Sequence, residues 1–169
     1  MALADIQRYG NRAFGYQGDE PFKVQAGGTP PAINAGEPVV RALGASTYVT
    51  PMATAKPVVG TDYMVGIAAT TSTETISVDG FVNVTPILDG ESYLIAPKVP
   101  ATFGVGSTPS QATYDALIGS RVTIDLTAGV YTLNSTDNAA NGCVVLPLDV
   151  NKFFGKVRIG FRQGTFFLN

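Results

Sequence analysis

The chain has 169 residues, of which 14% are charged and 45% are hydrophobic, and it contains 19 glycines and 11 prolines. Because it has no histidine, it lacks a Ser-His-Asp triad, a Cys-His pair and a histidine-ligated metal site, so we expect no enzyme. Its net charge of -2 and the absence of a basic run argue against binding to nucleic acid, where affinity comes from neutralised phosphates.

Residues 1–37 contain aromatic residues and many glycines but show no sustained hydrophobic period. The aromatic residues argue against pure disorder, since disordered segments contain few of them. We therefore predict an extended N-terminal arm that packs either on its own domain or on a neighbouring chain. Its first residues lack a cationic stretch followed by an apolar one, and no apolar run is long enough for a membrane span. We expect neither a secretory signal nor a membrane protein.

Residues 38–169 are predicted to form a single β domain. Short apolar or alternating segments bounded by turn residues predict strands over 37–42, 63–68 and 91–96. A further strand is predicted over 75–79 and continues, after Gly80, into 81–84. Gly80 breaks the alternation of that segment, as a glycine does at a β-bulge or at the bend of a barrel strand.

One short helix is predicted between residues 108 and 119. Thr108 is a candidate N-cap, Pro109 suits the first helical position, and Gly119 is a stop signal. The helix separates the strands of the first half of the domain from those of the second half.

Strands are predicted to follow the helix. Segments 121–126 and 130–133 alternate on either side of a Thr-Ala-Gly turn, which predicts a β-hairpin. Segment 143–148 is apolar and predicts a further strand. The last strand, over 156–162, places apolar and basic side chains on opposite faces: Val157, Ile159 and Phe161 on one, and Lys156, Arg158 and Arg162 on the other. The basic face is either solvated or docks on an acidic surface of another protein.

These elements together predict an all-β fold, a small β-barrel or sandwich with one short helix and the extended N-terminal arm. The cofactor and metal motifs are incomplete. Gly104-Val105-Gly106 lacks the third glycine of a dinucleotide fingerprint. The loop that starts at Asp137 has Leu148 where a calcium loop needs a bidentate glutamate. Cys143 has apolar neighbours and is predicted to be a small buried hydrophobe. We therefore expect no cofactor and no metal.

Four segments, in this order, resemble the small β-barrel capsid decoration (cement) proteins of tailed bacteriophages: YMVGIA at 63–68, TISVDGFVNVTP at 75–86, YLI at 93–95 and KVRI at 156–159. The resemblance implies a structural protein without catalytic residues that binds the major capsid protein at capsomer junctions, commonly as a homotrimer. It also implies a location on the capsid exterior of the virion, after synthesis in the host cytoplasm.

On this hypothesis the candidate interface residues, toward the capsid or another subunit, are Phe14, Tyr16 and Phe22 in the arm and Lys156, Arg158 and Arg162 in the last strand. Alternatively, the three aromatic residues close one end of this protein's own barrel. Two other functions stay open. One is another structural part of a phage tail or head-completion complex. The other is a glycan-binding module, in which tyrosines stack on sugars: Tyr9, Tyr16, Tyr63, Tyr93, Tyr114 and Tyr131.

Overall fold

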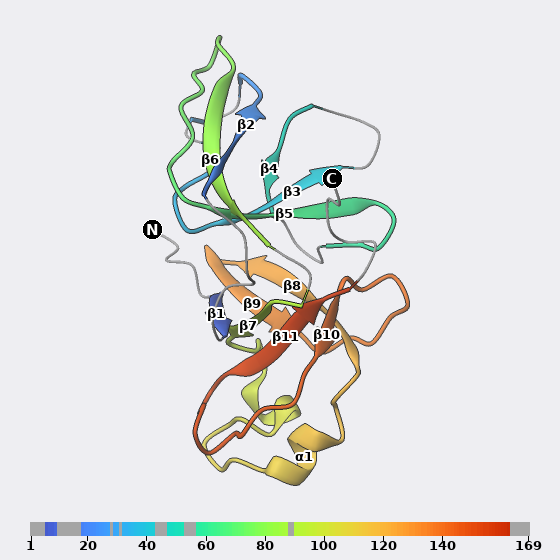
Figure 1. Cartoon of the computed structure of the whole chain (residues 1–169). Helices are drawn as coiled ribbons and strands as arrows, with labels where there is room; N and C mark the ends of the chain where they lie inside the picture. The colour runs from blue at the N-terminus through green and yellow to red at the C-terminus, as the bar shows by residue number, and fades with distance from the viewer. Residues whose placement is uncertain are drawn as a thin grey trace.

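The structure is a computed structural model that describes residues 6–9, 18–27, 29–30, 32–42, 47–52, 57–87 and 90–162. Within these residues its regular secondary structure consists almost entirely of β-strands (Figure 1). The strands form two antiparallel sheets, which confirms the predicted all-β class in the form of a sandwich with one short helix.

The first sheet lies in the lower part of Figure 1 and has six strands. In spatial order they are β1 (Gln7–Tyr9), β7 (Ser92–Ile95), β11 (Val157–Phe161), β10 (Cys143–Val145), β8 (Arg121–Thr127) and β9 (Val130–Asn134). The strands predicted after the helix are all present in this sheet, although β10 ends at Val145 rather than at 148.

The second sheet lies in the upper part of Figure 1 and has five strands. In spatial order they are β2 (Glu20–Val24), β6 (Gly80–Pro86), β5 (Asp62–Ala68), β3 (Pro38–Ala42) and β4 (Thr50–Pro51). The short helix α1 (Gln111–Asp115) and the 3-10 turn η1 (Pro100–Phe103) lie at the opposite end of the molecule from this sheet (Figure 1).

The larger hydrophobic cluster joins the two sheets. It packs Ile124 of β8 and Ile159 of β11 together with Val40 of β3 and Met64 of β5. All four side chains are almost completely buried. Because burial of apolar area is the main force that stabilises a fold, this shared core holds the sheets as one body.

A second cluster covers the other face of the five-stranded sheet. It contains Val39 and Val65, whose chain neighbours Val40 and Met64 belong to the first cluster. Successive side chains of a strand point to opposite faces, so this sheet is apolar on both sides. Ile33, which precedes β3 in the chain, is completely buried against this outer face.

The described parts of the predicted arm lie against this chain's own sheets. β1 pairs with β7, and β2 pairs with β6 over its whole length. Ile6, Val24 and Ile33 are buried. Packing on its own domain was one of the two alternatives for this segment. Contacts with a neighbouring chain, and the division of the chain at residue 37, stay predictions.

The strand predicted over 75–79 is wrong. These residues form an exposed loop that closes on itself, because the Thr75 N–H donates to the Val78 carbonyl at 2.9 Å and the Val78 N–H donates to Thr75 Oγ1 at 3.0 Å. Gly80 begins β6 and does not form a bulge inside a strand. A Cβ at this position would lie 2.0 Å from the backbone nitrogen of Glu74, so the close approach of two backbone segments requires the glycine.

The predicted helix is shorter than its sequence signals suggest. α1 covers Gln111–Asp115, and its N-cap is Ser110, whose side chain accepts a hydrogen bond from the Thr113 N–H. The predicted cap, Thr108, lies outside the helix, and Pro109 precedes the cap instead of following it. A serine that can bond the third helical N–H competes successfully with a threonine two residues earlier.

The predicted hairpin between β8 and β9 is confirmed, and its turn contains a strained alanine. Thr127 pairs with Val130, which leaves Ala128 and Gly129 as a two-residue turn with φ angles of 51° and 79°. Two positive φ angles are those of a type I′ turn, for which Asn-Gly is the favoured sequence.

We therefore expect Ala128→Asn to raise the free energy of unfolding by about 0.5–1 kcal/mol, because asparagine tolerates the left-handed region better than alanine does. Denaturant unfolding measures the change. Ala139→Asn is the matched control, since Ala139 is exposed but does not have a positive φ. An equal gain in both variants would contradict the turn-specific explanation.

Candidate interaction site

No group of three or more histidine, cysteine, aspartate or glutamate side chains gathers in the described residues to hold a metal. Cys143 is fully buried in β10, and burial raises the pKa of its thiol, so it stays protonated and unreactive. Among the described helices, none is long and apolar enough to cross a membrane.

Arg158, one of the predicted interface cations, contacts its own chain. Its guanidinium carbon lies 4.4 Å from the ring centre of Tyr9 in β1. Its Nε donates to Ser92 Oγ at 3.0 Å, and its Nη1 donates to the Pro147 carbonyl at 3.2 Å. Arg158 therefore fastens the edge strand β1 and the chain after β10 to the centre of the sheet.

The other two predicted interface cations flank β11 in the chain, Lys156 just before it and Arg162 just after it. Arg162 Nη1 donates to the carbonyls of Ala139 and Asn141, at 3.0 Å and 2.8 Å, and so fixes the loop before β10. Lys156 precedes β11 and is half-buried. Both arginines of the predicted basic face therefore bind groups of their own chain. Docking of this face on an acidic partner stays a prediction.

Of the three predicted aromatic residues, the structure describes one. Phe22 lies in β2, is half-buried, and packs against the second hydrophobic cluster. Phe14 and Tyr16 lie outside the described residues. Phe22 thus contributes to this protein's own core.

The largest exposed apolar side chains near one end of the molecule lie around the start of β6. Ile76 is 73% exposed, Val78 is 63% exposed and Phe81 is 51% exposed. We call these three residues the apolar tip, and residues 69–79, which connect β5 to β6, the tip loop. Figure 1 shows this connection at the end of the molecule farthest from α1. Because these three exposed apolar side chains lie close together in the chain, we take them as a candidate surface for binding another molecule.

Hydroxyl groups hold the tip loop on the segment that precedes β3. The Ile33 N–H donates to Ser72 Oγ at 3.0 Å, and the Ser72 N–H donates to the Ile33 carbonyl at 2.9 Å. On the other side, the Phe81 N–H donates to Thr73 Oγ1 and the Thr73 N–H donates to the Phe81 carbonyl, both at 3.0 Å. In both pairs a side-chain hydroxyl accepts the hydrogen bond that a backbone carbonyl accepts between paired strands.

Asp79 ties the end of the tip loop to two further segments. Its carboxylate accepts from the Ala26 N–H at 2.8 Å and from the Tyr48 hydroxyl at 2.6 Å. The hydrogen bond from Tyr48 and then that from Ala26 lower the pKa of Asp79. With these bonds the loop is fixed at both ends, so the apolar tip has little freedom to fold back onto the protein.

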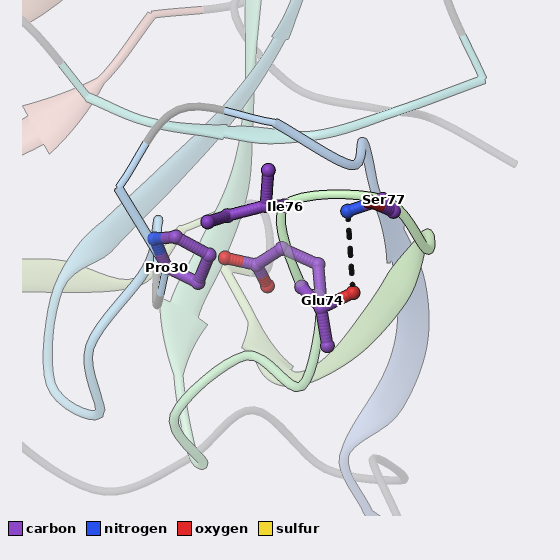
Figure 2. A pocket seen from close by; sticks show the side chains of 5 residues that line it. Pro30, Glu74, Ile76 and Ser77 are labelled. Atoms are coloured by element: carbon purple, nitrogen blue, oxygen red, sulfur yellow. Dashed lines mark hydrogen bonds between the residues drawn. The ribbon is translucent and has the colours of Figure 1, made fainter.

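A pocket of about 440 Å³ lies at the side of the tip loop and is lined by Pro30, Glu74, Thr75, Ile76 and Ser77. Figure 2 shows the Glu74 carboxylate beside the Pro30 ring and close to the Ile76 side chain. Glu74 is only 4% exposed. Its Oε1 accepts a hydrogen bond from the Ala32 N–H, whereas its Oε2 is buried and has no hydrogen-bond partner.

Glu74 is ionised at neutral pH. Burial acts to raise the pKa of Glu74, but the Ala32 N–H, the nearby Ser72 hydroxyl and the N–H of Glu74 itself outweigh it, so the pKa lies below its ordinary value of 4.5. The pocket is therefore a negatively charged hollow with apolar walls.

The lowered pKa of Glu74 predicts a loss of stability in acid. Between the ordinary value of 4.5 and the lower folded value, the unfolded chain binds more protons at this group than the folded chain. The contribution of Glu74 is thus complete above that range and disappears as the pH falls through the folded pKa. As the pH is lowered below 4.5, we expect the free energy of unfolding of the Glu74→Gln variant to fall less steeply than that of the native protein. Parallel curves would show that Glu74 has no such contribution.

The sequence did not reveal this site for a specific reason. Ile76 and Val78 alternate with polar residues and so favoured a half-buried strand, although both are exposed. The signal that was available is the unbroken run of threonine, serine and glutamate over 70–75, which is typical of a segment bonded through its side chains.

Comparisons with protein-family models, with curated proteins and with solved structures found no match for this chain.

Proposed function

We propose that this chain is a structural virion protein that decorates and stabilises the outside of a tailed-phage capsid by binding the major capsid protein at capsomer junctions. The proposal joins the resemblance of segments 63–68 and 75–86 with one structural observation, the exposed apolar tip. Segment 75–86 carries the tip, so the resemblance and the candidate site fall on the same part of the chain.

The apolar tip supports attachment to another protein because it is exposed and held in place. Burying a side chain such as isoleucine or phenylalanine yields roughly 1.5–3 kcal/mol, and the tip has three apolar side chains. A fixed loop loses little conformational entropy on binding, so more of that gain appears as affinity. The side chains of Ser72, Thr73 and Asp79 supply this fixation without covering the tip.

The glycan-binding alternative loses much of its support. Of the tyrosines that were candidates for stacking, Tyr93, Tyr114 and Tyr131 are buried in the larger cluster. Tyr114 also donates its hydroxyl hydrogen to the Leu146 carbonyl at 2.9 Å. Tyr9 lies under the Arg158 guanidinium and against Phe153. These rings are not arranged as a common platform for a sugar.

A homotrimer is part of the proposal. The outer strands are β1 and β9 in one sheet and β2 and β4 in the other, and outer strands need cover against unwanted pairing. Light scattering of the protein in solution is expected to give three times the chain mass of 17.6 kDa, and a reconstruction of the assembled particle is expected to show its copies in groups of three. Single chains under both conditions would contradict a trimer.

Location and copy number test the function. We expect antibody labelling of virions to mark the head surface and quantitative mass spectrometry to give hundreds of copies per particle. A few copies at the tail would contradict decoration and favour a tail or head-completion component instead.

A further inference from the structure

A symmetric trimer needs two different surfaces on each chain. Around a threefold axis every contact is head-to-tail, because each copy touches one neighbour with one surface and the second neighbour with another. Two such surfaces must complement each other in charge and in apolar contact. Exposed charged groups that find no partner within their own chain are therefore candidates for this pair of surfaces.

Two exposed carboxylates at the start of β2 differ from the others in the described residues. The others accept a hydrogen bond from an N–H or O–H donor of this chain: Asp79, Asp115, Asp137 and Asp149. Glu20 is exposed, and within the described part of the chain its carboxylate has no hydrogen bond or ion pair. Its neighbour Asp19 is exposed and accepts from the Thr85 hydroxyl. The start of β2 thus carries acidic charge that no described cation pairs with.

Two lysines in the loop before β11 are the basic counterpart. Lys152 is exposed and Lys156 is partly exposed, and neither forms an ion pair with a described residue. The ammonium of Lys152 lies 5.6 Å from the ring centre of Phe153. The other described lysines lie close to a carboxylate of this chain: Lys98 to Asp125, and Lys23 to Asp79.

The loop over 149–156, which we call the lysine loop, is fixed by its own backbone. The Phe153 N–H donates to the Asp149 carbonyl, and the Lys156 N–H donates to the Phe153 carbonyl, both at 3.1 Å. The ring of Phe154 is nevertheless 59% exposed. A fixed loop that holds an aromatic ring in solvent loses little conformational entropy when the ring is covered by a partner.

We propose that the lysine loop of one copy docks on the start of β2 of the next copy, with Lys152 and Lys156 facing Asp19 and Glu20, and with the Phe154 ring on exposed Pro21. The inference rests on the proposed function, which includes the homotrimer. The lysine loop belongs to the six-stranded sheet and β2 to the five-stranded sheet (Figure 1), so they are separate surfaces of one chain. Burial of the aromatic ring favours the contact, whereas the exposed ion pairs mainly determine which surfaces meet.

Charge reversal tests the pairing. Lys152→Glu with Lys156→Glu, or Asp19→Lys with Glu20→Lys, brings like charges together. Each pair of substitutions is expected to raise the concentration at which half of the chains are in trimers at least about tenfold. A chain with all four substitutions has opposite charges again and is expected to regain the native value. Analytical ultracentrifugation measures the change, and circular dichroism checks the fold. Undiminished assembly of either reversed variant, or a folded four-substitution chain that does not recover, would overturn the proposal.

A second pair of variants separates the contact from net charge. Lys152→Gln with Lys156→Gln lowers the net charge by two and is expected to weaken assembly at least about threefold, as the loss of exposed ion pairs does. Ser107→Glu with Ser135→Glu lowers the net charge equally at two exposed positions outside the lysine loop and is expected to leave assembly unchanged. Equal weakening in both would show a general effect of charge and would overturn the proposal.

Binding to phage heads distinguishes this inference from the proposed function. A native protein that stays a single chain in solution but binds heads would overturn the contact and leave decoration intact. Trimers that respond to the four substitutions as expected but do not bind heads would overturn decoration, while the contact between copies stands.

Discussion

Replacing Ile76 and Val78 together by aspartate is expected to weaken attachment to phage heads at least about 100-fold. Each of these side chains contributes roughly 1.5–3 kcal/mol when it is buried, and about 2.7 kcal/mol corresponds to about 100-fold in affinity. The substitution also brings two carboxylates into a surface that must lose water on binding. Co-sedimentation of the variant with heads assembled without the protein measures the loss.

The fold of this double variant should survive, because Ile76 and Val78 are 73% and 63% exposed. Val99→Asp is the matched control, since Val99 is 53% exposed but lies away from the tip, just before η1. We expect Val99→Asp to bind heads like the native protein. Normal binding by the double variant, or an equal loss in the control, would show that the tip does not contact the head.

Gly80→Ala is expected to lower the free energy of unfolding by about 3 kcal/mol or more, at the upper end of what an added methyl group does in a packed site. Its Cβ would lie 2.0 Å from the nitrogen and 2.5 Å from the Cα of Glu74, so backbone atoms must move rather than a flexible side chain. Denaturant unfolding measures the loss. Because Gly80 positions the tip loop, we also expect weaker head binding at temperatures where the variant is folded.

Gly18→Ala is the matched control for that substitution. A Cβ added at Gly18 would have no heavy atom within 4 Å, and the φ angle there is not positive, so the added methyl group meets open space. The stability of this variant should stay within about 0.5 kcal/mol of the native value. A small effect at Gly80, comparable to that at Gly18, would contradict the close approach of β6 to the tip loop.

Much of the fold could be predicted from local patterns. β8, β9 and β11 have a buried face, so their apolar residues alternate with polar ones in the sequence. By contrast, β2 carries Pro21 and has three exposed residues among its five, and β4 has only two residues, so neither has a detectable period. Both strands are fixed by pairing with partners, β6 and β3, and such pairing is not encoded in a short segment alone.

The candidate site was less predictable than the fold, because its geometry depends on contacts between distant segments. Ile33 and Ser72 lie 39 residues apart, and Ala26 and Asp79 lie 53 residues apart. Alternation around Ile76 and Val78 predicts a strand, but it does not show whether those two side chains are buried or exposed. Alternation predicts a shared face for Lys156, Arg158 and Arg162, but the internal acceptors that bind Arg158 and Arg162 come from segments whose approach the sequence does not specify.

A cryo-EM reconstruction of the virion head tests the proposed function most directly. We predict density for this protein on the outside of the shell, in hundreds of copies at capsomer junctions, with the apolar tip facing the capsid protein. Density in which Ile76 and Val78 point into solvent, or an outer shell surface without this protein, would contradict the proposal.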